Sequence, residues 1–275
     1  MEVYRRLLTV QDISCLGQCS MTVAMPVLSA CGHETCIMPT AMLSTHTGGF
    51  QQPAIRQLAD GMASIREHWK REHITFDAIC TGYLGSKAAV AETYRVIEEL
   101  LAPGGTVIVD PAMADNGKLY SGFDDAYVQA MTELCRRADI ILPNITEAAL
   151  LAGLPYRESL DPVYVRSLMT GLNHPCVVLT GVGYTPEETG IAVFQENALR
   201  EYHHPQIGKS FHGTGDLFAA CFAGAYLRGK TLMEAVQIAG DVVCLSIQNT
   251  VNSPKHWYGV KFETAIPELI DRLNQ

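Results

Sequence analysis

Four consecutive residues, Gly213-Thr214-Gly215-Asp216, have the types and the order that phosphoryl transfer requires. The two glycines lack a Cβ, so the backbone can turn sharply and present its N–H groups to an anion. The apolar run Leu217–Leu227 predicts a helix whose free N-terminal amides and dipole point at the same place. Asp216 would stand beside that anion, as a general base for an attacking hydroxyl does. The same residues also suit a plain loop and helix cap, since threonine and aspartate are ordinary capping residues.

Polar residues also follow several of the short apolar runs that predict strands. Each of these segments could mark a turn by itself. Because ligands bind at the carboxyl ends of the strands in a parallel sheet, we expect these residues to gather at one edge, near Asp216. They would bring two acids, an amide and several hydroxyls to that edge. The segments are Gln11-Asp12, Thr81-Gly82-Tyr83, Asp110-Pro111, Pro143–Glu147 and Thr180-Gly181.

The runs that predict strands alternate with longer stretches that predict helices. Several strand candidates are apolar throughout, as expected where both faces of a strand are covered. The alternation predicts an α/β fold with a mostly parallel central sheet and helices on both faces. A hairpin turn is expected at Gln195–Asn197, at the sheet edge. The predicted strands are Leu7–Gln11, Thr35–Met38, Ala78–Thr81, Thr106–Val109, Ile140–Leu142, Val177–Leu179, Ile191–Phe194 and Leu199–His203. The predicted helices are Ser20–Ala30, Pro53–Glu72, Lys87–Leu101, Phe123–Arg137, Thr146–Ala152, Asp161–Leu172, Gly215–Leu227, Leu232–Thr250 and Glu263–Leu273.

Composition limits the class of protein. The chain has 275 residues, of which 48% are hydrophobic, and a net charge of −9. A chain of this kind can bury a large core, and no repeat or linker divides it, so we expect residues 1–275 to form one domain. The acidic balance, without a basic block, disfavours nucleic acid and anionic membrane surfaces as partners. No apolar run reaches the length of a membrane span and no signal peptide pattern is present, so a cytoplasmic protein is expected.

Several familiar motifs are incomplete. Gly208-Lys209-Ser210 is similar to the end of a P-loop, but the earlier glycine of that motif falls at His203. Gly181-Val182-Gly183 begins a dinucleotide fingerprint whose third glycine is replaced by proline. His46 and His212 lack the paired spacing of a metal site. The nine cysteines are odd in number and mostly lie in apolar runs, which predicts buried reduced thiols rather than zinc sites or disulfides.

Motifs in order along nearly the whole chain resemble the ribokinase-like superfamily and, within it, the pyridoxal kinases. Gly213–Asp216 resembles the carboxyl-terminal signature of the superfamily, and Asn144–Glu147 resembles its Asn-x-x-Glu motif. Asp110-Pro111 matches a segment of its vitamin kinases. The landmarks shared with pyridoxal kinases are Val10–Ser14 with Gly17, Leu43–Phe50 and Thr81–Ser86. Several ordered motifs are far more specific than any one of them.

The resemblance implies ATP-dependent phosphorylation of the 5′-hydroxymethyl group of pyridoxal, pyridoxine or pyridoxamine, with Asp216 as the catalytic base. The amides of the anion loop, Gly213, Thr214 and Gly215, would stabilise the charge on the transferred phosphoryl group. The residues implied at the ATP end are Asp110, Asn144, Glu147, Thr180 and Gly181, with Asp110 and Glu147 organising Mg²⁺. The residues implied at the ring are Asp12, Ser14, Thr47 and Tyr83. A K⁺ ion and a homodimer are further properties that the resemblance implies.

Asp12 departs from the resemblance, because many pyridoxal kinases have serine at this position. An acid there would suit the amine of pyridoxamine or a related hydroxymethylpyrimidine. Two other functions therefore stay open: a hydroxymethylpyrimidine kinase of thiamine synthesis, and a non-catalytic protein that binds vitamin B6 or nucleotide. Tyr83 and the His46-Thr47 loop favour the B6 substrate. Asn144 and Glu147 also have the spacing of a helix cap, a role they could combine with ligand binding.

Overall fold

The computed structural model describes residues 4–208 and 211–275. Lys209 and Ser210, from the tripeptide that is similar to the end of a P-loop, lie outside the described residues. Nine strands of the described chain form one sheet, and five neighbouring pairs within it are parallel. In order across the sheet they are β11 (Ala198–Pro205), β10 (Glu188–Gln195), β9 (Cys176–Thr180), β8 (Ile140–Ile141), β5 (Leu101–Val109), β4 (Phe76–Thr81), β1 (Arg6–Ser14), β2 (Glu34–Leu43) and β3 (Ile55–Gln57).

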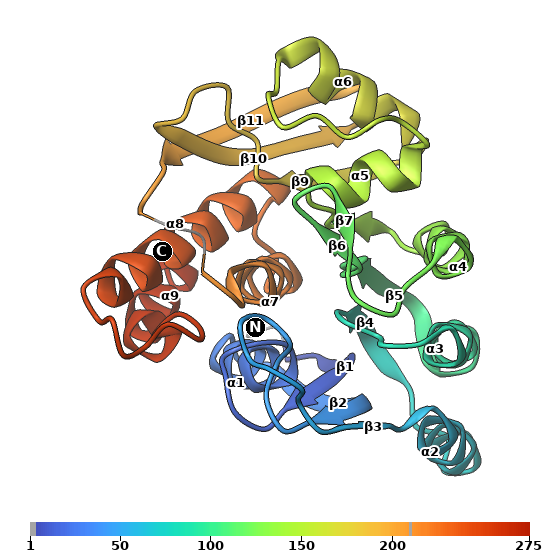
Figure 1. Ribbon diagram of the computed structural model, residues 1–275. Helices are drawn as coiled ribbons and strands as arrows, with labels where there is room; N and C mark the ends of the chain where they lie inside the picture. The colour runs from blue at the N-terminus through green and yellow to red at the C-terminus, as the bar shows by residue number, and fades with distance from the viewer. Residues whose placement is uncertain (1–3, 209–210) are drawn as a thin grey trace.

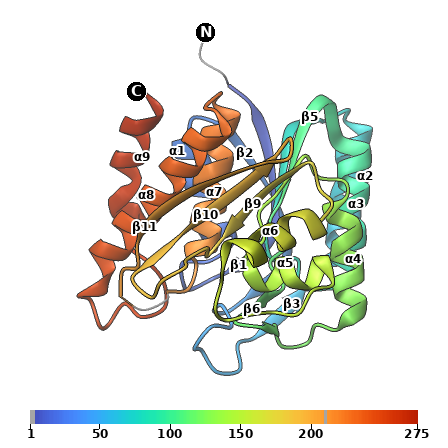
Figure 2. The same ribbon diagram turned by 90° about the horizontal axis from the view of Figure 1, so that it is seen from above.

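Helices cover both faces of this sheet (Figures 1 and 2). One face packs against α1 (Met21–Ala30), α7 (Thr214–Leu227), α8 (Leu232–Val251), the short 3-10 turn Phe262–Ala265 and α9 (Ile266–Leu273). The other face packs against α2 (Ala59–Arg71), α3 (Lys87–Leu100), α4 (Asp125–Cys135), α5 (Ile145–Ala152) and α6 (Pro162–Gly171). A small hairpin of β6 (Ala114–Asp115) and β7 (Lys118–Leu119) lies beside α5. The predicted α/β fold with a mostly parallel sheet is confirmed.

The apolar runs form strands because each run contributes hydrophobic side chains to the core on both faces of the sheet. Adjacent residues of a strand point to opposite faces. In β1, Leu7 belongs to the cluster around α7 whereas Leu8 belongs to the cluster around α3. In β9, Val178 and Val177 divide in the same way. Continuous apolar strands between two helical layers are therefore the solution that buries the most hydrophobic surface.

Side-chain caps start several of the helices at the residues where the chain leaves the sheet. Ser86, Asp124 and Asp161 accept hydrogen bonds from the main-chain N–H three residues later, at the starts of α3, α4 and α6. Thr231 and Glu234 form a reciprocal capping box at the start of α8. Each cap satisfies an N–H that the helix leaves unpaired, which fixes where the helix begins.

Some predicted boundaries are wrong. The predicted helix Pro53–Glu72 begins only at Ala59, because Ile55–Gln57 pairs with β2 as the antiparallel edge strand β3. The predicted strand Thr35–Met38 continues to Leu43, since its carboxyl end pairs with both β1 and β3. The hairpin at Gln195–Asn197 is confirmed: it joins β10 to the edge strand β11, and Glu196 and Asn197 have the positive φ values of a tight turn.

Among the described residues, no helix is both long and apolar enough to span a bilayer.

Candidate active site

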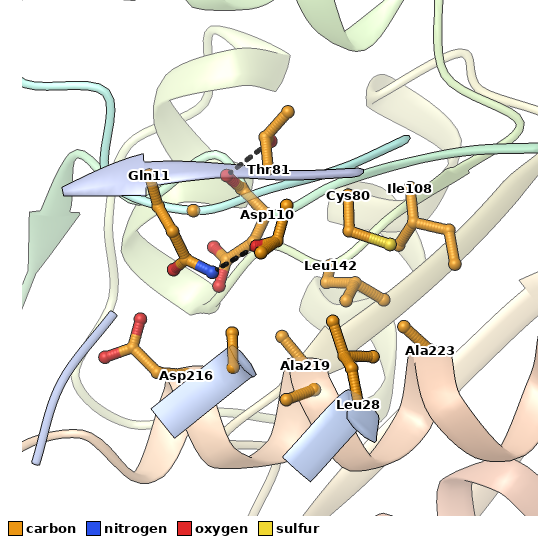
Figure 3. Close-up of a pocket in the computed structure, with 14 residues that line it drawn as sticks. Gln11, Leu28, Cys80, Thr81, Ile108, Asp110, Leu142, Asp216, Ala219 and Ala223 are labelled. Carbon is orange, nitrogen blue, oxygen red and sulfur yellow. Dashed lines mark hydrogen bonds between the residues drawn. The ribbon is translucent and has the colours of Figure 1, made fainter. Parts of the chain in front are cut away.

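The polar residues that follow the strands gather at one edge of the sheet, as the sequence predicts. The carboxyl ends of β1, β4 and β5 face the start of α7, and residues from all four elements line one small cavity. Figure 3 shows Asp216 on α7 opposite Gln11 of β1 and Asp110, which follows the last residue of β5. Gln11 is buried, and its Nε2 donates to Thr9 Oγ1 at 2.6 Å. The predicted meeting of Gln11, Thr81 and Asp110 with Asp216 is therefore confirmed.

This cavity is too small to hold a substrate. Its volume is about 20 Å³, and its walls include the small side chains Ala219, Ala220 and Ala223 of α7. A space of that size holds about one water molecule.

The backbone at the start of α7 is built for an anion. Gly213 has φ of 79°, and a Cβ on it would come within 1.8 Å of the Gln18 carbonyl oxygen. Only glycine fits a left-handed position with so little room. Gly215 differs, since a Cβ there would meet nothing within 4 Å. The first turn of the helix is thus open on the side of Gly215, where its unpaired N–H groups can receive a phosphate.

Asp216 is half-buried in the first turn of α7. Burial raises its pKa to about 7, the main-chain N–H of Ser20 opposes the rise, and the negative charge of Asp12 adds to it. A carboxyl group with a pKa near neutrality exchanges a proton readily at physiological pH. Asp216 therefore has the ionisation that a general base needs near neutral pH.

Two further acids, Asp110 and Glu147, lie near Asp216. The pKa of Asp110 is raised well above its usual value, first by burial, then by the charges of Glu147 and Asp216. Mutual repulsion of this kind indicates a place where a hard divalent cation would be stabilising, so these acids fit Mg²⁺. Within the described parts of the chain, no three Asp, Glu, His or Cys side chains converge as a ready metal cage. Phosphate and water would thus have to complete the coordination, as is usual for Mg²⁺.

Both carboxylate oxygens of Glu147 accept hydrogen bonds from main-chain N–H groups. Its Oε1 accepts from the N–H groups of Met113 and Ala114 at 3.0 and 3.4 Å, and its Oε2 accepts from the N–H of Asn144 at 2.9 Å. Burial raises its pKa to about 7 in spite of these bonds. Glu147 therefore shapes the loop after Asp110, and any contact of this side chain with Mg²⁺ would use the remaining lone pairs or a water.

Asn144 is the cap of α5. Its Oδ1 accepts from Glu147 N–H at 2.9 Å, which completes a capping box, and its Nδ2 donates to the Ala114 carbonyl at 2.8 Å. The capping role that the sequence left open is confirmed. Thr180 forms a parallel bridge with Asn144, and Gly181 follows in an exposed turn with φ of 78°. The structure thus brings the predicted ATP-end residues next to one another.

Three of the four predicted ring residues, Asp12, Ser14 and Tyr83, form a second group beside Asp216, and Thr47 does not join them. Asp12 is 2% exposed, and Ser14 Oγ donates to its Oδ2 at 3.0 Å. The Asp12 N–H donates to the Tyr83 carbonyl at 3.1 Å, and the Tyr83 ring stacks on Phe123 with centroids 5.5 Å apart. Asp12 and Ser14 lie within β1 rather than after it, because the strand extends to Ser14. Thr47 is exposed in the loop between β2 and β3, and none of its side-chain bonds joins it to the other three.

Sequence reasoning missed the loop before α1 as part of the site. Cys19 and Ser20 are buried there. Burial raises the pKa of the Cys19 thiol, and the negative charges of Asp216 and Asp12 add to the rise. No motif marks these residues, because their role follows from backbone geometry. His46 and His212 are neighbours, with ring centroids 5.2 Å apart. His46 donates from Nε2 to the Tyr258 carbonyl at 2.7 Å and accepts at Nδ1 from Gly48, so both of its nitrogens are occupied.

Comparisons with known proteins agree with this geometry. The family model described as phosphomethylpyrimidine kinase matches residues 26–261. A crystal structure of pyridoxal kinase from Lactobacillus plantarum is 32% identical, covers 97% of both chains and superimposes with a TM-score of 0.90. A putative phosphomethylpyrimidine kinase from Bacteroides thetaiotaomicron, crystallised with pyridoxal, is 29% identical over 96% of both chains with a TM-score of 0.89. The pyridoxal kinase of Ovis aries is 27% identical over 98% of this chain and 93% of its own length. The chain therefore belongs to the phosphomethylpyrimidine kinase family, among its pyridoxal kinase-like members with the ribokinase-like fold.

Proposed function

We propose that this kinase transfers the γ-phosphoryl group of ATP to the 5′-hydroxymethyl group of pyridoxal, pyridoxine or pyridoxamine. The observation that carries the proposal is Asp216, a carboxyl group with a pKa of about 7 in the first turn of a helix that is open to an anion at Gly215. Asp216 takes the proton of the hydroxyl, whose oxygen then forms the new bond to the γ-phosphorus. The bond from that phosphorus to the bridging oxygen breaks, and ADP leaves.

The anion loop acts on the phosphoryl group. The N–H groups of Gly213, Thr214 and Gly215 lie at the positive end of the α7 dipole. They would therefore stabilise the negative charge on the oxygens of the phosphoryl group during its transfer. Asn144, Thr180 and Gly181 hold the nucleotide end. Asp110 and Glu147 would hold Mg²⁺, directly or through water, and the ion would supply positive charge to the phosphates.

We expect Asp12, Ser14 and Tyr83 to bind the ring, with Thr47 reaching it only if the loop between β2 and β3 lies over the bound substrate. Tyr83 offers a flat apolar face, since its ring continues the aromatic stack with Phe123. Asp12 and Ser14, which are joined by a hydrogen bond, offer polar groups to the ring. A heterocycle with one hydroxymethyl arm would lie between these side chains, with that arm directed at Asp216.

A hydroxymethylpyrimidine kinase is the competing function. The presence of pyridoxal in crystals of the Bacteroides relative supports the B6 substrate. Steady-state phosphorylation of pyridoxal, pyridoxine, pyridoxamine and hydroxymethylpyrimidine, side by side, tests the proposal. We expect kcat/KM for at least one B6 form to exceed that for the pyrimidine. Turnover of the pyrimidine alone would refute the proposal, and tight binding without turnover of any of the four would favour a non-catalytic binding protein.

Four more properties stay predictions. We expect residues 1–275 to act as one kinase domain, the protein to be a homodimer, and K⁺ to increase its activity. We also expect a cytoplasmic location. Sedimentation with and without ligand would test whether the protein is a homodimer. Activity in K⁺ buffer compared with Na⁺ buffer would test the effect of K⁺.

A further inference from the structure

Three basic side chains, Arg5, His33 and Arg228, meet at the edge of the sheet away from Asp216. Arg5 comes immediately before β1, His33 comes immediately before β2, and Arg228 is the residue that ends α7. The amino ends of the parallel strands β1 and β2 lie here, whereas the candidate active site lies at carboxyl ends. Because a helix rises about 1.5 Å per residue, Arg228 lies about 18 Å along α7 from Asp216. This basic cluster is therefore separate from the anion loop.

The strand register brings Arg5 and His33 side by side. The N–H of Glu34 donates to the Arg5 carbonyl at 2.9 Å, and Arg6 pairs with Glu34, so Arg5 and His33 precede neighbouring positions of the two strands. Alternate residues of a strand share a face. Leu7 packs in the cluster around α7, so Arg5, two residues earlier, faces the same helix. His33 reaches that helix as well, because its Nε2 donates to the Gly224 carbonyl at 3.0 Å.

Arg228 approaches the same place from the end of α7. Its Nη1 donates to the Cys31 carbonyl at 3.1 Å. The same nitrogen lies so close to Gly32 that a Cβ on this glycine would be 2.8 Å from it. Gly32 directly precedes His33, so the guanidinium group lies beside the histidine. The contact of Arg228 Nη2 with Asn274 Oδ1, at 3.5 Å, joins the cluster to the C-terminal end of α9, which lies at the same edge as the start of β1 (Figure 2).

Two nitrogens of the basic cluster are buried without a hydrogen-bond partner in the described chain. They are Arg5 Nε and His33 Nδ1. His33 is only 4% exposed, whereas Arg5 and Arg228 are half-buried and can be reached from solvent. A buried polar nitrogen that lacks a partner costs about 1–3 kcal/mol, so a ligand that satisfies both would be stabilised here.

No acid of the described chain neutralises the cluster. None of the ion pairs in residues 4–208 and 211–275 includes Arg5 or Arg228. The acids at these strand ends serve Arg6 instead: Glu34 accepts from its Nε at 3.0 Å, and Asp77 accepts from its main-chain N–H at 2.8 Å. Two guanidinium charges are thus left beside a buried imidazole.

Helix ends explain only part of this arrangement. Basic groups stabilise the negative ends of helix dipoles, and both α1 and α7 end here. Arg228 and His33 do contact carbonyls at those ends, through Nη1 and Nε2. Arg5 Nε and His33 Nδ1 are not used in this way. Burial lowers the pKa of His33, the Gly224 carbonyl opposes the change, and the charges of Arg228 and Arg5 lower it further. An anion between the arginines would offset those charges, and His33 could then also carry a proton on Nδ1.

We propose that Arg5, His33 and Arg228 form a binding site for a small oxyanion of the phosphate type. The planar guanidinium groups present paired N–H donors whose spacing suits phosphate oxygens. His33 takes a proton from solvent at Nδ1 and donates it as a hydrogen bond to the same anion, while Nε2 keeps its bond to Gly224. Binding there does not require the proposed kinase activity, because the site lies at the other end of α7.

Calorimetric titration with inorganic phosphate at constant ionic strength tests the site. The protein is first saturated with Mg²⁺ and a non-hydrolysable ATP analogue, so that phosphate cannot enter the anion loop. We expect the wild type to bind one phosphate per chain. Arg5→Gln and Arg228→Gln should each raise the phosphate Kd by about tenfold or more, because a charge-assisted hydrogen bond is lost. Arg200→Gln is the matched control: it removes the same charge from an exposed position on β11 and should leave the Kd unchanged.

Two further measurements sharpen the test. Phosphate should shift the NMR resonance of His33 Nδ1 in the wild type and not in Arg228→Gln. Phenyl phosphate that binds about as tightly as inorganic phosphate would identify the ligand as the phosphate group of a larger molecule, and binding of inorganic phosphate alone would identify the free ion.

Equal phosphate affinities of the wild type, Arg5→Gln and Arg228→Gln would overturn the inference, as would a wild type that binds no phosphate. An unshifted His33 resonance on phosphate binding would equally contradict it. Arg228→Gln loses the bond to Cys31 and could fail to fold, which circular dichroism would reveal. Arg5→Gln breaks no ion pair of the described chain, so its Kd decides the question in that case.

Discussion

The carbonyl oxygen of Gln18 lies against Gly213 so closely that a Cβ on the glycine would be 1.8 Å from it. The loop before α1 and the loop before α7 are therefore interlocked. Thr22 fastens the first loop by donating from Oγ1 to the carbonyls of Gly17 and Cys19. The contact explains how segments about 195 residues apart in sequence, by the difference between 213 and 18, hold one anion site in a fixed shape.

Gly213→Ala should damage both fold and activity. The new methyl group would meet the Gln18 carbonyl at a left-handed φ, so we expect a loss of about 2 kcal/mol or more in the free energy of unfolding. Gly215→Ala is the matched control, because its methyl group would enter open space within the same loop. Urea unfolding of the two variants checks this. Equal stability of Gly213→Ala and the wild type would contradict the interlocked geometry.

Activity should depend on the ionisation of Asp216. Its pKa is raised to about 7, so the carboxylate that accepts the proton is present above that pH and is lost as the pH falls through it. We expect kcat/KM to fall by up to about tenfold per pH unit below pH 7. Profiles with pyridoxine and with pyridoxamine distinguish titration of the enzyme from titration of the substrate. Profiles that are flat from pH 6 to pH 8 would exclude a base with this pKa.

Asp216 should also lower the stability of the protein at high pH. A carboxyl group whose pKa is raised in the folded state binds its proton more tightly there than in the unfolded chain, so its contribution to stability declines as the pH rises above the unfolded value of 3.8. Asp216→Asn removes this charge. The variant should melt at a higher temperature than the wild type at pH 8, with a smaller difference at pH 5. Calorimetry at both pH values checks the sign, which would be reversed if Asp216 were a stabilising cap.

Glu147 should act on the fold and on Mg²⁺ separately. Glu147→Ala leaves three backbone donors without their acceptor, at Met113, Ala114 and Asn144, and should cost about 3 kcal/mol or more of stability. Glu147→Gln keeps one acceptor oxygen and should cost less. In Glu147→Gln the Mg²⁺ concentration for half-maximal activity should rise about tenfold, since one negative charge near the metal is gone. An unchanged Mg²⁺ dependence in a folded Glu147→Gln protein would limit Glu147 to shaping the loop.

The sequence predicts the fold well because the signals there are strong and local. Apolar strands such as Val177–Leu179 must be covered on both faces, and the cap at Asn144 and the turn at Glu196-Asn197 depend on residues next to one another. The strand Ile55–Gln57 could not be predicted in this way. All three of its residues are exposed, so it has no hydrophobic pattern, and it forms because its backbone pairs with β2.

The same distinction holds at the candidate site. Asp216 and the glycines before it are adjacent in sequence, so their shared chemistry can be read directly. Ser20 is an ordinary serine in the sequence, and only the structure shows that it is buried with a positive φ of 53°. Glu147 has the spacing of a cap and of a metal ligand alike, and only the three N–H groups around it establish the first.

The most direct measurement is the turnover of Asp216→Asn together with its affinity for ATP. The amide preserves the shape of the side chain but cannot accept the hydroxyl proton, so kcat should fall by about a thousandfold or more while the Kd for ATP stays close to the wild-type value. A folded Asp216→Asn protein that phosphorylates its alcohol at the wild-type rate would contradict the assignment of the base, and with it the account of this site.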